Sequence, residues 1–290
     1  MDHREEPKDD RDANASAATE VASTEVRRIW RPTAVRNVEV LQIRNTGKRC
    51  GAFHERFALS FSRSGSGTVR YRRRTAEHDR GSLFFLEPGE VHSSPAAIGL
   101  LGWDVLFVEP SRMKAAAAAA GMRGAVHWRS IVARDHEAVH SFKRALAALG
   151  DDAEPDVALC ALDDLLALLL RHHAEAGVAP KERPRDTSLV RRLKNRLHDQ
   201  VIDGVSLDEL ATDCGVSACH LVRCFSAEVG IPPHQYLMHL RVERARELLT
   251  HGKPSTEVAH ELGFSDQSHF NRHFTRIVGV PPGRYARAVR

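Results

Sequence analysis

The chain has 290 residues, of which 42% are hydrophobic and 28% are charged, and its formal net charge is +4. This length predicts two domains with separate cores, and the absence of any run of about 18 apolar residues excludes a membrane span. The small net charge says little about partners, so nucleic-acid binding has to be argued from individual residues.

The first part of the chain predicts a flexible arm over residues 1–36, because it begins with charges of both signs and few aromatic or branched aliphatic residues. It lacks the basic-then-apolar order of a secretory signal, so we expect a cytoplasmic protein. The five cysteines are an odd number without a framework spacing, which is typical of free thiols in a reducing compartment.

Residues 37–112 show the signals of short strands. Alternating apolar residues over 57–61 and 69–71 flank the turn-like segment Ser64-Gly65-Ser66-Gly67, which predicts a hairpin. Further apolar runs at 83–86 and 103–108 are bounded by glycine and proline. Several short strands at this spacing predict a small β-barrel or sandwich.

Residues 113–176 change to helix formers, and we expect two helices there. The second, over about 155–176, carries more leucine than one modest core contact requires. This stripe predicts either a dimer seam or intramolecular core, with neither favoured. The polar segment 177–186 contains two prolines and is predicted to be the linker.

Residues 187–290 contain two copies of one pattern. Aligned on each other, the copies match Ala211 with Ala259, Gly215 with Gly263, and Phe225 with Phe274. Each copy predicts a helix, a glycine turn and a second helix, which is the helix-turn-helix arrangement, over residues 206–229 and 255–278. A generic pair of helical hairpins is the alternative.

The second helix of each copy has one apolar face, so its other face is expected to point outward and read bases in the major groove. A helix over about 232–251 is expected to fix the distance between the units, so that one chain reads two successive grooves about 34 Å apart. The candidate base readers are Ala218, Cys219, Val222, Arg223 and Ser226 in the first copy, and Gln267, Ser268, Asn271, Arg272 and Thr275 in the second.

The paired motifs HLVRCF and HFNRHF, the phrase ELGFSDQSHFNRHF and the closing GVPPGRYAR resemble the AraC/XylS family of transcription regulators. The resemblance covers about residues 186–290 and implies a DNA-binding domain of seven helices. It also implies base-facing positions at 218, 219, 222 and 223, and at 267, 268, 271 and 272. The first recognition helix departs from the family in its small or apolar readers, so we expect the second to be the principal reader.

Residues 54–113 are similar to the cupin-type effector domain of the same family, through the segment GSLFFLEPGEVH at 81–92. Glu87 stands there where a proline is usual. The resemblance implies a small-molecule effector inside the barrel, with plain barrel core as the alternative for the same residues. The candidate effector contacts are Phe57, Phe61, Tyr71, Phe85, His92 and Trp103.

A cupin metalloenzyme fused to a DNA-binding domain is the rival from the enzyme class. Stable divalent metal binding needs three or four convergent ligands, and of His54, His78 and His92 only His92 has a motif-supported place. We therefore expect no catalytic residue, no metal and no cofactor.

A thiol-responsive regulator is a second rival, because Cys214, Cys219 and Cys224 recur every five residues. On one helix Cys219 and Cys224 lie about 140° apart, so they share neither a metal nor a disulfide. Cys224 is expected to be a small buried hydrophobe. Cys219, exposed at the DNA face, keeps this alternative open.

We therefore expect an α+β protein with an N-terminal cupin-like β-barrel, a helical dimerisation and linker region, and an all-α C-terminal domain with two helix-turn-helix units. Its expected function is sequence-specific transcription regulation, by family likeness activation, under the control of a small-molecule effector. The expected partners are double-stranded DNA, the effector, RNA polymerase and a second copy of the chain.

Overall fold

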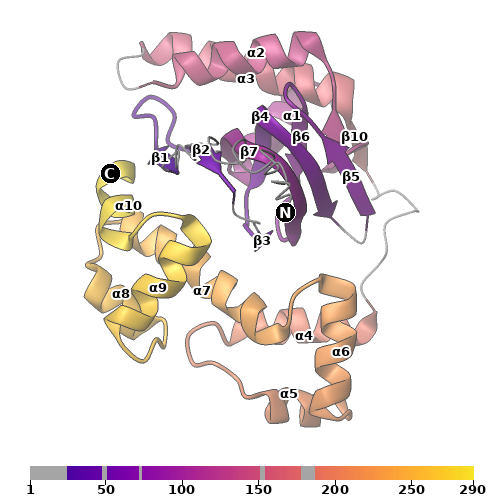
Figure 1. Ribbon diagram of the computed structural model, residues 1–290, viewed down its shortest axis with the longest axis vertical. Helices are drawn as coiled ribbons and strands as arrows, with labels where there is room; N and C mark the ends of the chain where they lie inside the picture. Colours follow the sequence, from indigo (N-terminus) through magenta and orange to yellow (C-terminus); the bar gives the residue numbers. More distant parts are fainter. Residues whose placement is uncertain (1–24, 48–50, 72–73, 151–153, 178–186) are drawn as a thin grey trace, which may run out of the picture.

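The computed structural model describes residues 25–47, 51–71, 74–150, 154–177 and 187–290. A curved sheet with helices on one face forms the N-terminal part, and a bundle of helices forms the C-terminal part (Figure 1). The mixed fold class and the order of the parts predicted from the sequence are confirmed. None of the helices in the described ranges combines the length and hydropathy of a membrane span.

The main sheet is antiparallel and eight-stranded in the described residues, with the order β1-β2-β7-β4-β6-β9, while β3 pairs with β7 and β5 with β4. Two further strands, β8 and β10, pair with each other. The strands are β1 (Val26–Trp30), β2 (Val38–Thr46), β3 (Gly51–Ala52), β4 (Phe57–Tyr71), β5 (Arg74–His78), β6 (Leu83–Leu86), β7 (His92–Val108), β8 (Ala125–Trp128), β9 (Val132–Ala133) and β10 (Ala174–Gly177).

The hairpin predicted at residues 64–67 is wrong, because β4 continues through this segment. β7 runs beside β4 with Ser64 opposite Gly102 and Ser66 opposite Ile98, and the register shifts on both sides of Ser64. Gly65 has φ +73°, and a Cβ there would lie 2.7 Å from Leu101 Cδ2. The serine-glycine run is therefore a bulged part of a long strand, since a bulge uses the same glycine conformations as a turn.

Part of the predicted flexible arm belongs to the sheet. β1 pairs with β2 along its whole length, Ile29 and Trp30 are buried, and Trp30 Nε1 donates a hydrogen bond of 2.7 Å to Leu149 O. The apolar part of β1 is too short to stand out in the sequence, and its burial depends on helices far along the chain. The remainder of the arm up to residue 24 lies outside the described residues.

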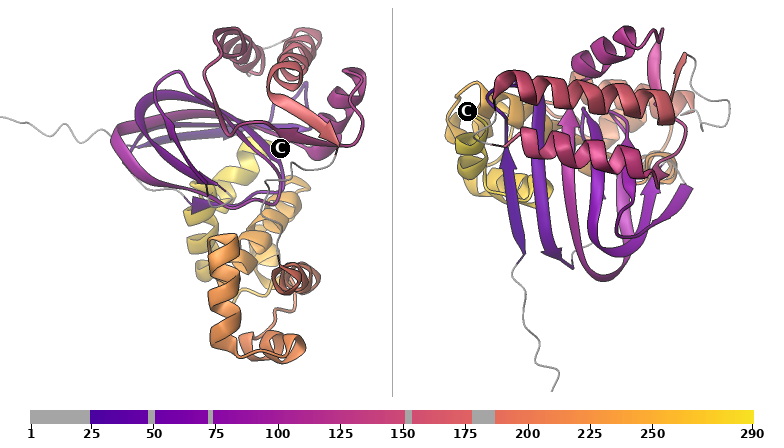
Figure 2. Two further views of the ribbon diagram at one scale, coloured as in Figure 1. Left: turned by 90° about the vertical axis from the view of Figure 1, so that its right-hand side faces the viewer. Right: turned by 90° about the horizontal axis from the view of Figure 1, so that it is seen from above.

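Three helices, not the two expected, follow the sheet strands: α1 (Pro110–Ala119), α2 (His136–Ala148) and α3 (Pro155–His173). α2 and α3 cover the outer face of the sheet (Figure 2). Leu162 and Leu166 are fully buried in a core that also contains Phe61. The predicted dimer seam is therefore wrong at these leucines, because the outer face of the sheet occupies the stripe.

The described C-terminal residues form seven helices. The predicted linker lies outside the described residues except for Gly177, which ends β10. The helices are α4 (Ser188–Asp199), α5 (Leu207–Cys214), α6 (Ala218–Val229), α7 (Pro233–Thr250), α8 (Ser255–Glu261), α9 (Gln267–Val278) and α10 (Pro282–Val289).

Two helix-turn-helix units, α5–α6 and α8–α9, lie at the two ends of α7. The first begins with a capping box in which Ser206 and Glu209 each bond the other's backbone. Gly215 and Gly263 have φ of +67° and +66°, which is the left-handed conformation that lets each short turn form.

Arg241, in the middle of α7, joins the two units. Its Nε donates to Val201 O at 2.8 Å, and its Nη1 donates to Gly263 O at 3.0 Å. The end of α4 is thereby tied to the turn of the second unit, so one buried guanidinium satisfies backbone carbonyls that helix ends leave unpaired.

A buried ionic cluster joins the two parts of the chain. Glu39 of β2 is fully buried, contacts Arg246 of α7, and accepts a hydrogen bond of 2.7 Å from Tyr285 Oη of α10. Arg56 Nη1 lies 3.2 Å from the same carboxylate and Arg56 Nη2 lies 3.6 Å from Glu243. The C-terminal helices are thus held against the side of the sheet opposite α2 and α3 (Figure 2).

Candidate functional site

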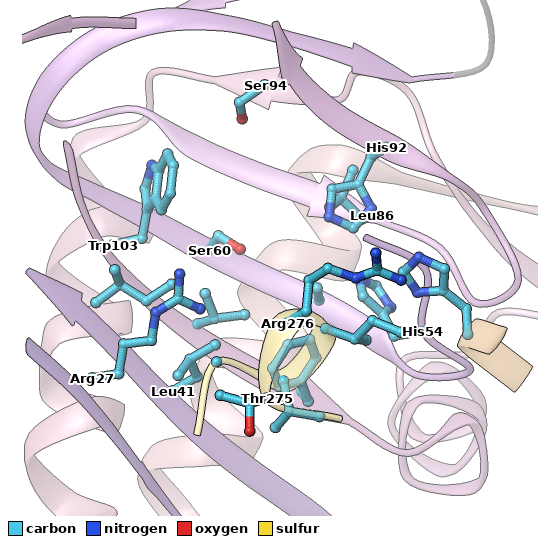
Figure 3. A pocket seen from close by; sticks show the side chains of 18 of the residues that line it. Arg27, Leu41, His54, Ser60, Leu86, His92, Ser94, Trp103, Thr275 and Arg276 are labelled. Atoms are coloured by element: carbon cyan, nitrogen blue, oxygen red, sulfur yellow. The ribbon is translucent and has the colours of Figure 1, made fainter. Parts of the chain in front are cut away.

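A cavity of about 1150 Å³ lies between the inner face of the sheet and the C-terminal helices. Its sheet walls are largely apolar, with Leu41 and Leu86 among the lining residues, and α7 and α9 supply the other side (Figure 3). The cavity has the size and the mostly apolar lining of a small-molecule site.

Two of the predicted effector contacts, His92 and Trp103, line this cavity. Phe57, Phe61 and Phe85 do not, because they belong to the core beneath α2 and α3. Successive side chains of a strand point to opposite faces of the sheet, so phenylalanines that share one face lie together away from the cavity.

The residues between these phenylalanines face the cavity instead. Ala58 and Ser60 of β4 and Phe84 of β6 line it, although the sequence gave no reason to prefer that face. Tyr71 is buried on the cavity side of the sheet but is absent from the lining, and its hydroxyl accepts a hydrogen bond of 3.4 Å from Glu87 N.

Three histidines from separate segments meet at the cavity. His54 precedes β4, His92 begins β7 and His239 lies on α7, and the sequence analysis missed the role of His239. Within the described part of the chain, His54 Nε2, His92 Nδ1 and His239 Nδ1 are buried without a hydrogen-bond partner. Buried polar atoms are normally satisfied, so these atoms indicate a missing ligand group or water.

The three imidazoles are neutral at pH 7. Burial lowers the pKa of His54 well below its usual value, and it lowers the pKa values of His92 and His239 to about 4. His54 Nδ1 lies 2.7 Å from Arg56 O, a contact in which the ring nitrogen must donate. In the neutral ring, His54 Nε2 is then an acceptor that lacks a donor.

The predicted base readers of α9 divide between solvent and the cavity. Gln267 and Ser268, at the start of the helix, are exposed. Asn271, Arg272 and Thr275 line the cavity, and Asn271 and Arg272 also remain exposed. One face of the second recognition helix is therefore shared by the predicted DNA surface and the cavity.

The predicted base readers of α6 are less uniformly outward than expected. Cys219 and Arg223 are exposed and Ser226 is half-buried. Ala218 and Val222 are half-buried against the hydrophobic core, because α6 presents a wider apolar face than its large residues alone indicate. Arg223 is the charged side chain of this set that is available to DNA.

The rival readings lose their structural basis. His78 packs on Phe84, with ring centroids 4.7 Å apart, and His54 packs on His92 at 5.1 Å, and these three histidines form no metal-ligating group in the described ranges. Cys224 is half-buried rather than buried, with Sγ 3.3 Å from His220 Nε2.

Two family models match the chain. The AraC-like ligand binding domain matches residues 44–170, and a helix-turn-helix domain matches residues 210–288. This chain belongs to the AraC family of transcription regulators. The first match contains most of the cavity's sheet wall, and the second contains both DNA-reading helices of this AraC-family regulator.

Individual relatives agree with this assignment. An uncharacterized HTH-type transcriptional regulator, YbfI of Bacillus subtilis, is 26% identical over 219 residues, which cover 75% of this chain and 79% of YbfI. The activator RhaS of Escherichia coli is 28% identical over 54% of this chain and 55% of RhaS. LumQ of Photobacterium leiognathi, a probable transcriptional regulator, is 34% identical over 34% of this chain and 43% of LumQ.

A solved structure supports the fold alone. Apo ToxT from Vibrio cholerae strain SCE256 superposes with a TM-score of 0.51 at 9% identity, covering 87% of this chain and 97% of ToxT. The arrangement of an AraC-family effector domain beside two helix-turn-helix units therefore occurs in a known structure.

Proposed function

We propose that this AraC-family regulator binds a small effector in the cavity between the sheet and α9, and that the effector controls how α9 meets DNA. The observation that carries this proposal is that Thr275 and Arg272 of the recognition helix line the same cavity as His54 and Trp103 of the ligand-binding domain. A ligand in that space would touch both parts of the chain.

The lining indicates the chemistry of the effector. Leu41, Leu86 and Trp103 favour an apolar body, and the unpaired acceptor His54 Nε2 favours a hydroxyl or N–H group on the ligand. We therefore expect a compact, mainly apolar molecule with at least one hydrogen-bond donor. A molecule without a donor leaves the buried imidazole unsatisfied and loses affinity.

The effector acts on DNA binding through its difference in affinity for two placements of α9. A ligand shifts such an equilibrium only by its preference for one state, and contacts to Asn271 and Thr275 supply that preference. By reciprocity, a specific DNA site changes the affinity for the effector by the same factor.

The wider role follows from the family. We infer a cytoplasmic homodimer that reads double-stranded DNA, recruits RNA polymerase as an activator, and acts by binding rather than by catalysis. The support is that the relatives are named transcriptional regulators and, for RhaS, a transcriptional activator. Sedimentation of the purified protein with and without its selected operator measures the dimer.

The experiment first selects duplexes from a random library with the full-length protein and then screens small molecules for a change in affinity for the selected site. Ser60→Leu fills the cavity and should abolish the response to an active molecule while leaving basal DNA binding intact. Arg70→Leu, on an exposed position of the same strand, is the matched control. An unchanged response in Ser60→Leu would place the effector elsewhere.

A further inference from the structure

Three metal-ligating side chains meet where α2 begins and α3 ends, away from the effector cavity. Asp135 Oδ2 lies 3.0 Å from His172 Nδ1 and 2.9 Å from His173 Nε2. All three residues are half-buried, and their ligand atoms lie within 4.8 Å of one another. This is the one such group among the described residues.

We propose that Asp135, His172 and His173 bind a divalent late transition-metal ion, with Zn²⁺ as the representative. Bonds of about 2.1 Å place neighbouring ligands of an octahedral ion about 3.0 Å apart. The two carboxylate-to-imidazole distances of 2.9 and 3.0 Å match that spacing. Two imidazoles and one carboxylate favour zinc, nickel or cobalt over magnesium or calcium, which take oxygen ligands.

The carboxylate is held in place by its second oxygen. Asp135 is the N-cap of α2, and its Oδ1 accepts a hydrogen bond of 3.0 Å from Ala138 N. Burial alone would raise the pKa of Asp135, but this hydrogen bond and the two histidines lower it to about 2. Oδ2 is therefore a charged ligand atom at neutral pH, oriented by a contact that a metal would leave intact.

The histidines are also positioned by the fold. The His173 ring packs against Phe85, with centroids 5.1 Å apart, and His173 O accepts a hydrogen bond of 2.9 Å from Arg129 N. β10 continues directly from His173 and pairs with β8. Ligands fixed by packing and pairing lose little freedom on binding, which favours affinity.

The same helix offers a competing set of ligands. α2 opens with His136-Glu137-Ala138-Val139-His140, a spacing that places two histidines one turn apart and occurs in zinc sites. His136 and His140 are exposed and lie outside the group formed by Asp135 and the α3 histidines. They provide a matched control on the same element.

Isothermal titration of the full-length protein with Zn²⁺ tests the proposal. Wild type should show one saturable site, and its melting temperature should rise with Zn²⁺ because the ion binds only the folded state. Asp135→Asn keeps the capping oxygen and should weaken Zn²⁺ at least about tenfold, as should His172→Ala. Circular dichroism without metal checks that both variants fold.

The double variant His136→Ala/His140→Ala should retain the site and its melting shift. The proposal is overturned if Zn²⁺ shows no saturable site in wild type, or if binding survives in folded Asp135→Asn and His172→Ala. It is also overturned if binding disappears with His136 and His140, because the ion would then belong to the exposed pair.

Discussion

Arg272 lies on the face of α9 that we assign to DNA, and it also lines the effector cavity. Its exposed guanidinium presents a fork that matches O6 and N7 of guanine. The residue therefore links the two sites in one side chain, and its replacement should alter base preference rather than fold stability.

We expect Arg272→Ala to lower affinity for the best DNA site by about 10- to 100-fold, because a bidentate base contact contributes roughly 1–3 kcal/mol. Fluorescence anisotropy with the selected site and with random duplexes measures the change. Arg287→Ala, an exposed arginine of α10 outside both recognition helices, should have little effect. Equal weakening on both DNAs, with a salt slope reduced by about one, would make Arg272 a phosphate contact instead.

The neutral histidines of the cavity make stability depend on pH. His92 and His239 have pKa values of about 4 in the folded protein against an ordinary 6.5, with burial as the main cause in each. The unfolded chain binds more protons between these values, so stability is present above about pH 6.5 and falls as the pH drops towards 4.

We expect the free energy of unfolding, measured by urea titration, to decrease from pH 7 to pH 4. His239→Leu removes one of these groups and should flatten the decrease, since leucine takes up no proton on unfolding. A pH profile identical to that of wild type would show that His239 titrates normally in the folded state.

At the scale of elements, the two helix-turn-helix turns are equivalent in sequence but differ in their surroundings. Gly215 has open space where a Cβ would stand, whereas a Cβ at Gly263 would lie 2.7 Å from Ile202 O. Both residues are left-handed, but the second turn is also packed against the end of α4 and Arg241.

Gly215→Ala should cost about 1–2 kcal/mol, the strain of a side chain in the left-handed region. Gly263→Ala should cost more, because the backbone of residue 202 must also move. Thermal unfolding of the two variants measures the difference, and equal losses would mean that the packing around Gly263 yields freely.

The leucine stripe of α3 belongs to the interior of the N-terminal part. Leu166 is fully exposed to neighbouring side chains and not to solvent, with 0% of its surface accessible. Leu166→Ala should therefore destabilise the protein by about 2–5 kcal/mol through a cavity, without changing its mass in sedimentation. Conversion of a dimer to a folded monomer by this change would restore the seam interpretation.

At the scale of the whole molecule, the Glu39 cluster holds the C-terminal helices against the sheet. Burial would raise the pKa of Glu39, but Arg246 and Arg56 lower it to about 2 from an ordinary 4.5. The carboxylate therefore contributes stability above about pH 4.5 that is lost as the pH falls towards 2.

Glu39→Gln should cost about 3–5 kcal/mol, because it leaves Arg246 and Arg56 buried with an uncompensated charge. Tyr285→Phe removes only the hydroxyl, whose hydrogen bond to a charged group contributes roughly 1.5–3 kcal/mol. Both variants should increase cleavage between the two parts in limited proteolysis. If Glu39→Gln is as stable as wild type, the cluster does not hold the domains together.

The sequence by itself determined the helix-turn-helix units and the family. Their signals are local: Ser206 and Glu209 cap a helix, Gly215 permits a turn, and Phe225 marks one apolar face. Such features act within a few residues of chain, so a single sequence, and a repeat within it, is enough to read them.

Only the tertiary structure decided which surfaces meet. Alternation along β4 is equally compatible with Phe61 or Ser60 facing the cavity, and packing of α2 and α3 on the outer face selects Ser60. Thr275 reaches the cavity, and Asp135 reaches His172, only because distant segments fold against each other. Periodicity specifies a face of an element, whereas its partner depends on contacts that are remote in the chain.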